Sequence, residues 1–295
     1  MEKKMTNVSI LIVNYNTREL LADCLQSVYE HTKDVTFEII VVDNASTDGS
    51  EDYVTTRFPA VRWIASKENL GFGKANNLGA KAAQGEYLFL LNSDTLLCNN
   101  AVKMFYDYAV SHKHEDMLLG GCLLTQDGKP NTSYGEFPSI GNEIRYLWRK
   151  FISILLKRTA KETTVEKDVG FIVGADMFMP YELYARFGGF DPKIFMYYEE
   201  TDLQLRMAKA GIRRRVIVGP EIIHLDGGSF EKRGLTYRRF VMSQTSYNYY
   251  VRKHYKGISY AWYKFMLGFI RLTVFAQLSW TLKERLNAWC LVWKK

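Results

Sequence analysis

The chain has 295 residues, 47% of them hydrophobic, and this composition excludes an intrinsically disordered protein and provides for a sizeable core. Its four cysteines show no Cys-x-x-Cys spacing, so they indicate neither a zinc site nor a disulfide framework and favour a reducing compartment. The net charge is +7, but no nucleic-acid-binding fingerprint accompanies it, and we expect no nucleic-acid partner. The first apolar segment has six residues, too few for a signal peptide, which predicts a cytoplasmic location.

The first hundred residues alternate short apolar runs with helical patterns, as expected for a parallel sheet covered on both faces. The runs that we predict as buried strands are residues 8–13, 37–42, 61–65 and 87–91. A helix follows the first strand, with Asn16 as its N-cap and Glu19 three residues later. A second helix is predicted over residues 74–84, closed by Gly85. The predicted fold class is therefore α/β, with a doubly wound, mainly parallel sheet flanked by helices.

Polar residues follow three of the predicted strands. Ligands of such sheets bind at the carboxyl ends of the strands, which points to Asn14 and Tyr15, to Asp43, and to residues 92–94. A dinucleotide site would need Gly-x-Gly-x-x-Gly after the first strand, and no glycine is present there. The glycines of residues 69–79 come after the third strand and lack the spacing of a P-loop. For Asp43 and Asp48, Asx turns are the structural alternative to ligand binding.

Three carboxylates, Glu199, Glu200 and Asp202, follow the aromatic run of residues 195–198. One interpretation is structural, because acidic residues in the first turn of a helix interact favourably with the helix dipole. The other is catalytic, because burial and mutual repulsion raise the pKa of a carboxyl group toward the range of a general base. Adjacent helical residues point in different directions, so Glu199 and Glu200 cannot both face one ligand.

The second half of the chain is rich in basic and aromatic residues, notably in residues 144–158 and 259–295. Residues 265–282 contain a single charge, Arg271, near the middle. Such a run barely reaches across a bilayer and a central arginine is costly there, so we predict helices that lie in a membrane interface. A single membrane span, packing in the core and a dimer interface are the alternatives. In the first stretch, the candidates for lipid contact are Trp148, Phe151, Ile154 and Leu155.

Six ordered stretches of the chain resemble glycosyltransferase family 2, whose catalytic domain has the nucleotide-sugar-binding fold called GT-A. They are VSILIVNYNT, VVDNASTDGS, NLGFGKANNLGA, LLNSDT, GGFDPKIFMYYEETDL and HLDGGS. They look most similar to the bacterial rhamnosyltransferase-like branch, which builds cell-surface polysaccharides on lipid carriers. The resemblance implies a GT-A catalytic domain over residues 1–230 and a helical, basic and aromatic C-terminal extension over residues 231–295.

The resemblance also implies roles for individual residues. Those that would bind the nucleotide sugar are Asn14, Tyr15, Asp43, Asn69, Gly71, Asn76, Asn92, Ser93 and Asp94. Asp94 would also bind Mn²⁺ or Mg²⁺ together with His224, and an imidazole suits Mn²⁺ better. Asn92 stands where the family's fuller Asp-x-Asp pattern has its first aspartate, which weakens this ligand set. The family's acidic pair places the catalytic base at Glu200, with Glu199 and Asp202 orienting it or holding the loop.

The activity that the resemblance implies is a single displacement with inversion at the anomeric carbon. The expected donor is dTDP-L-rhamnose, with UDP-linked hexoses next, and the expected acceptor is a glycan or a polyprenyl-diphosphate-linked glycan. The enzyme would act in polysaccharide and cell-wall synthesis as a peripheral protein on the inner face of the plasma membrane. The alternative is a catalytically inactive nucleotide-binding or scaffolding subunit, for which the replacement at Asn92 is the argument.

Overall fold

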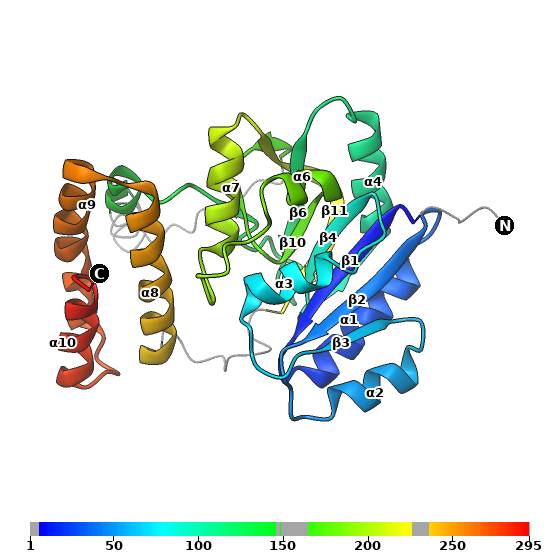
Figure 1. Cartoon of the computed structure of the whole chain (residues 1–295), viewed down its shortest axis with the longest axis horizontal. Coiled ribbons are helices and arrows are strands. Elements are labelled where there is room, and N and C mark those ends of the chain that lie inside the picture. The colour runs from blue at the N-terminus through cyan, green and yellow to red at the C-terminus, as the bar shows by residue number, and fades with distance from the viewer. Residues whose placement is uncertain (1–5, 146–147, 149–164, 226–235, 295) are drawn as a thin grey trace. The chain divides into compact units, whose positions relative to one another are not determined.

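The computed structural model describes residues 6–145, 148, 165–225 and 236–294. These residues form two compact units (Figure 1). Unit 1 contains the described residues up to 135, together with 165–193 and 199–225. Unit 2 contains the described residues of 136–148, the short segment 194–198 and residues 236–294. The C-terminal extension therefore forms a unit with two earlier stretches of the chain.

Unit 1 is built around a nine-stranded sheet. Its strands are β1 (Val8–Asn14), β2 (Phe37–Asp43), β3 (Arg62–Ala65), β4 (Tyr87–Asn92), β5 (Thr95–Leu97), β6 (Met117–Leu124), β8 (Lys167–Asp168), β10 (Asp176–Pro180) and β11 (Arg213–His224). The order is β3-β2-β1-β4-β10-β6-β11-β5, with β8 paired to β11. The half formed by β3, β2, β1 and β4 is parallel, and these are the four strands predicted from the sequence. A separate ladder joins β7 (Tyr134–Gly135) to β9 (Phe171–Ile172).

Helices cover both faces of this sheet, which confirms the doubly wound arrangement (Figure 1). They are α1 (Arg18–His31), α2 (Ser50–Arg57), α3 (Phe72–Ala80), α4 (Ala101–Ser111), α6 (Tyr181–Arg186) and α7 (Glu199–Lys209). Ile10 and Ile12 of β1 pack on the side of α1 and α4, whereas Leu11 packs on the side of α3 and α7. Successive residues of a strand point to opposite faces, so both cores need the continuous apolar runs seen in the sequence.

The expected N-cap of the first helix is wrong. α1 begins at Arg18, its N-cap is Thr17, and Asn16 has φ 54°. The side chain of Asn16 instead accepts a hydrogen bond from Thr47 N at 2.8 Å. The helix N-terminus is capped from outside, because Arg18 N donates to Asp48 Oδ2 at 2.9 Å. A loop distant in sequence thus takes the role that local spacing assigned to Asn16.

The second helix is also shifted, since α3 spans Phe72–Ala80 rather than residues 74–84. Gly85 does not close it. Gly85 N donates to Ser9 Oγ at 2.8 Å, and a Cβ placed on Gly85 would lie 2.4 Å from Ser9 N. Glycine is required here because the backbones of residues 85 and 9 approach so closely.

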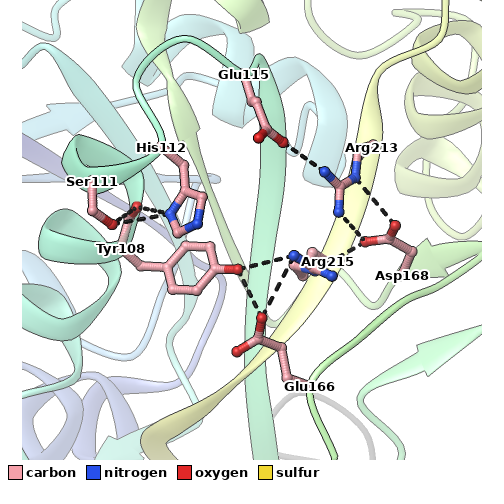
Figure 2. A network of polar contacts seen from close by, with 8 residues as sticks. All are labelled: Tyr108, Ser111, His112, Glu115, Glu166, Asp168, Arg213 and Arg215. Carbon is pink, nitrogen blue, oxygen red and sulfur yellow. Dashed lines mark hydrogen bonds and ion pairs between the residues drawn. The ribbon is translucent and has the colours of Figure 1, made fainter.

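A network of charged residues holds β8 against β11 (Figure 2). Arg213 Nη1 donates to Glu115 Oε2 at 2.6 Å, and its Nε donates to Asp168 Oδ2 at 3.1 Å. Arg215 Nε lies 3.0 Å from Asp168 Oδ1, and its Nη1 donates to Tyr108 OH. Two arginines of the basic run at 213–215 are thus paired with acidic side chains of unit 1.

Unit 2 contains α8 (Tyr237–His254), α9 (Gly257–Ile270), a 3₁₀ helix η1 (Arg271–Ala276) and α10 (Leu282–Leu291). The buried residues of one apolar cluster in this unit are Phe240, Val274, Trp280 and Ala288. The apolar run of residues 265–282 is divided among α9, η1 and the start of α10 and is not one helix. None of the described helices is long and apolar enough to cross a membrane. Of the residues proposed for lipid contact in the earlier stretch, Trp148 is exposed and the others lie outside the described residues.

Candidate active site

The parallel strands of unit 1 bring the polar residues of three motifs to one edge of the sheet. In the β1–β2 register Asn14 lies opposite Asp43, and in the β1–β4 register Val13 lies opposite Asn92. Asn14 Nδ2 donates to Asp43 Oδ1 at 2.7 Å. The second carboxylate oxygen of Asp43 accepts from Ser46 N at 2.9 Å. These contacts fix the carboxylate of Asp43 at the strand end. The bond from Ser46 spans three residues, one more than an Asx turn.

Residues of this edge differ in their access to a ligand. Asn14 is fully buried, and its Oδ1 accepts from Thr17 Oγ1 at 2.7 Å. Thr17 Oγ1 also lies 3.1 Å from Ser93 Oγ. Tyr15 and Asn16 are exposed, so both side chains are open to a bound molecule. Asn14, Thr17 and Ser93 form the layer beneath, which positions the loops of the edge.

The third motif forms a turn that leads into α3. Gly71 has φ 78°, and its N–H donates to Asn69 Oδ1 at 2.9 Å. Asn44, which the sequence reasoning did not single out, donates to Gly71 O and accepts from Leu70 N, both at 3.3 Å. Asn76 is buried and donates to Phe72 O within the helix. Asn44 therefore ties the second motif to the third, and its position directly after Asp43 was the available signal.

Asp94 and His224 lie next to each other although they are far apart in the sequence. β5 pairs antiparallel with β11 and sets Thr95 opposite His224, and Leu225 N donates to Asp94 O at 2.9 Å. As a result, His224 Nε2 lies 3.4 Å from Asp94 Oδ1. Asn92 Nδ2 lies 3.5 Å from the same imidazole nitrogen. The tertiary structure thus joins the fourth and sixth motifs.

This pair fits a divalent cation that is shared with a substrate. A carboxylate oxygen and an imidazole nitrogen are ligands that Mn²⁺ accepts, and Mg²⁺ commonly combines one or two carboxylates with substrate phosphates. Among the described residues, no group of three or more His, Cys, Asp or Glu side chains could hold a metal ion. Residues 226–229 of the sixth motif lie outside the described part of the chain.

The acidic cluster opens α7, as expected, with Glu199 at its first position. Glu199 is buried, and in the described part of the structure its Oε2 has no hydrogen-bond partner. Burial, and then the neighbouring charge of Glu200, raise the pKa of Glu199 well above its ordinary value. The two residues before the helix, Tyr197 and Tyr198, both have φ 68°, a conformation that costs free energy for non-glycine residues.

Glu200 has different surroundings from its neighbour. It is half-buried, and Thr201 Oγ1 donates to its Oε1 at 3.4 Å. Burial raises the pKa of Glu200, although hydrogen bonds from backbone groups and from Thr201 oppose this shift. Glu200 thus combines a raised pKa with access from solvent, the two properties that a general base needs.

Asp202 is fully buried and supports the loop before α7. Its Oδ2 accepts from Arg206 Nε at 3.0 Å, one helical turn later. Arg206 in turn donates to Gly189 O at 2.7 Å and to Phe187 O. Asp202 therefore orients Arg206, which binds the backbone of residues 187 and 189. The i, i+4 spacing of Asp202 and Arg206 was a signal that the sequence reasoning did not use.

Glu199 and Glu200 each lie close to a glycine of another part of unit 1. A Cβ placed on Gly73 would lie 3.6 Å from Glu199 Cβ, and one placed on Gly174 would lie 3.9 Å from Glu200 Cβ. The next residue, Ala175, accepts a hydrogen bond from Asn92 N at 3.0 Å. The segment at 174–175 therefore lies next to Glu200 and is bonded to the strand end that precedes Asp94.

A cavity of about 510 Å³ lies between α3, α6 and residues 188–192. Its lining includes Asn77, which accepts from Tyr184 OH at 2.6 Å and from Phe190 N at 3.0 Å and donates to Phe190 O at 2.8 Å. None of the residues predicted to bind the donor or the metal lines this cavity. Asn77 was missed in the sequence, and it fixes the position of Phe190, which packs beside Gly73.

The mixed sheet with its strand-end loops has the GT-A fold, and two solved structures share it. The crystal structure of GalNAc-T7 with UDP, GalNAc and Mn²⁺ matches 85% of this chain and 48% of that one, with TM-score 0.60 and 15% identity. The crystal structure of S. aureus TarS matches 96% of this chain and 48% of that one, with TM-score 0.58 and 16% identity. At these identities the likeness establishes the fold.

The chain belongs to glycosyltransferase family 2, whose model, described as Glycosyl transferase family 2, matches residues 9–174. N-acetylglucosaminyl-diphospho-decaprenol L-rhamnosyltransferase of Mycobacterium tuberculosis is 27% identical over 202 residues, which are 63% of this chain and 66% of the relative. Rhamnosyltransferase WbbL of Escherichia coli K12 is 24% identical over 227 residues, 74% of this chain and 83% of the relative. The family and branch expected from the sequence are confirmed, and the chain covers just under two thirds of the mycobacterial relative.

Proposed function

We propose that this protein transfers a sugar from a nucleoside-diphosphate donor to a lipid-linked or glycan acceptor in cell-surface polysaccharide synthesis. The observation that carries the proposal is the pairing of Asp94 with His224. Residues 174–175 lie next to Glu200 and are hydrogen-bonded to the strand end that precedes Asp94. The similarity to the mycobacterial and E. coli rhamnosyltransferases supports dTDP-L-rhamnose as the donor, with UDP-linked hexoses next. The lipid-linked acceptor named for the mycobacterial relative supports an enzyme that works peripherally on the inner face of the plasma membrane.

The chemistry is a single displacement. The acceptor oxygen forms a bond to the anomeric carbon while the bond from that carbon to the diphosphate breaks, and the configuration inverts. Glu200 takes the proton of the acceptor hydroxyl, and its raised pKa makes it a stronger proton acceptor than an ordinary glutamate. Asp94 and His224 would hold a Mn²⁺ or Mg²⁺ ion, which when bound neutralises charge on the departing diphosphate. Asp43, Asn69, Gly71 and the exposed Tyr15 would bind the nucleoside part.

A donor screen tests this proposal. The protein is incubated with each nucleotide sugar and a short lipid-diphosphate acceptor mimic, with and without Mn²⁺, and released nucleoside diphosphate is measured. We expect release that needs both the acceptor and the ion. Nucleotide binding without turnover on every acceptor would instead support the inactive, scaffolding alternative.

A further inference from the structure

One face of α9 exposes apolar side chains where a surface helix normally exposes polar ones. This α9 face consists of Ile258, Trp262, Phe265, Phe269 and, directly after the helix, Leu272. Ile258 is 89% exposed, and Trp262 and Phe269 are each 58% exposed. The side chains are continuous, because Trp262 stacks on Phe265 with ring centroids 6.0 Å apart and Phe265 meets Phe269 edge-on at 5.0 Å. Exposed patches of this kind mark binding surfaces.

The opposite face of α9 accounts for the packing of the helix. Tyr263 and Leu267 are buried, and Gly268 O accepts from Trp289 Nε1 of α10 at 3.0 Å. Lys264, the one charged residue of α9, is turned inward and donates to Asn248 Oδ1 at 3.3 Å and to the carbonyl of Val292. The fold of unit 2 thus packs one side of α9 and leaves an uncharged apolar side exposed to solvent. In Figure 1, α9 lies beside α8 and α10.

The segment that carries this face is strongly basic. Residues 236–295 contain eleven Lys and Arg and one acidic residue, Glu284, so this segment has a net charge of +10 against +7 for the whole chain. Arg252 and Lys256, immediately before α9, are exposed. An apolar helix face flanked by lysine and arginine is the pattern of helices that lie in the interface of an anionic bilayer.

We propose that the α9 face docks on an anionic lipid bilayer. Charge favours the bilayer over a second copy of the chain as the partner. A symmetric dimer would bring together two segments that each have a net charge of +10, whereas an anionic surface attracts such a segment. With 14 residues, α9 is about 21 Å long, shorter than the hydrocarbon core of about 30 Å, so it lies in the interface. Trp262 suits the headgroup region, where tryptophan is enriched.

Co-sedimentation of the full-length protein with vesicles tests this inference. Vesicles of phosphatidylglycerol with phosphatidylcholine are compared with vesicles of phosphatidylcholine alone. We expect binding to the anionic vesicles and a loss of at least about tenfold in the variant W262Q/F265Q/F269Q. Arg252→Gln with Lys256→Gln is expected to reduce the preference for anionic lipid. The matched control is Val110→Gln with Val218→Gln, which removes exposed apolar residues of unit 1 and should leave binding unchanged.

Undiminished vesicle binding of the triple variant would overturn the inference, as would equal binding of the wild type to both kinds of vesicle. If the wild type is a dimer that the substitutions convert to a monomer, and neither protein binds vesicles, the α9 face binds a second copy of the chain.

If the triple variant does not fold, Trp262→Gln alone is measured and is expected to weaken vesicle binding about threefold. The inference deepens the proposed function. It rests on that function in one respect, the expectation that the acceptor is carried by a lipid. Vesicle binding is measured without donor or metal, so a protein that binds but does not transfer would fail the proposed function only.

Discussion

Glu199 and Glu200 are neighbours in the sequence but differ in exposure, and this difference ranks two substitutions. Glu200→Gln keeps the shape of the side chain but cannot accept the acceptor's proton, so we expect turnover to fall by about 10²- to 10⁴-fold with little change in donor affinity. Glu199→Gln, the matched control, is expected to cost less. Release of nucleoside diphosphate measures both. A larger loss for Glu199→Gln would assign the base to Glu199, and near-normal turnover for both would leave the cluster a structural role.

The buried carboxyl of Glu199 also predicts a pH-dependent stability. Its pKa in the folded chain is raised above the ordinary value of 4.5 by burial and then by Glu200. Between 4.5 and the raised pKa, the folded chain holds a proton that the unfolded chain has lost, so the free energy of unfolding falls as pH rises. Glu199→Gln is neutral at every pH and should reduce this slope and raise Tm at neutral pH, while the raised pKa of Glu200 leaves part of the slope. Thermal unfolding from pH 4.5 to neutrality checks this, and an unchanged slope in the variant would contradict it.

At the scale of elements, the pairing of β5 with β11 is what places Asp94 beside His224. Because the carboxylate contributes the negative charge, Asp94→Ala should remove most metal-dependent binding of the nucleotide, and His224→Ala should weaken it less. Calorimetric titration of nucleotide with and without Mn²⁺ measures this. Asp107→Ala, at an exposed aspartate of α4, is the control and should bind normally. Unchanged metal-dependent affinity in both site variants would exclude the pair as the metal site.

The junction of β1 and β4 depends on Gly85. A Cβ at this position would lie 2.4 Å from Ser9 N and 2.8 Å from Val8 C, and these backbone atoms are fixed by the sheet. Gly85→Ala should therefore destabilise the protein by about 1–3 kcal/mol or more. Gly141→Ala is the control, since the nearest atom to its Cβ would be Ser139 Oγ at 4.0 Å. Equal denaturation midpoints for the two variants would show that the sheet accommodates the methyl group.

At the scale of the whole molecule, the contacts of Arg271 join separate stretches of the chain within unit 2. Its Nη1 lies 3.5 Å from Glu143 Oε2, its Nε donates to Gln244 Oε1 at 2.9 Å, and its guanidinium lies 5.4 Å from the ring centre of Tyr247. Tyr247 OH also donates to Glu143 Oε1 at 2.7 Å. The arginine that would be costly in a membrane therefore has partners within the protein.

Removing this arginine tests that interpretation. Arg271→Leu should lower stability by about 1–3 kcal/mol, because Glu143 and Gln244 would lose a charge-assisted partner. Arg238→Leu, at an exposed arginine of α8, is the control and should be near neutral. Thermal unfolding measures both. If Arg271→Leu were as stable as the control, the contacts of Arg271 would not hold unit 2 together.

The sequence by itself determined the parallel half of the sheet and the family of the protein. Continuous apolar runs specify buried strands locally, and the ordered motifs at their ends need no knowledge of distant contacts. The tertiary structure alone decided that Asp48 caps α1 and which of the two neighbouring glutamates is more exposed. It also brought His224 to Asp94, a pairing that the sequence supported only through its resemblance to the family. It also decided that Arg271 is paired inside unit 2 and that α9 keeps an apolar face in solvent. Each of these depends on contacts between segments far apart in the chain, and periodicity and spacing describe only neighbours.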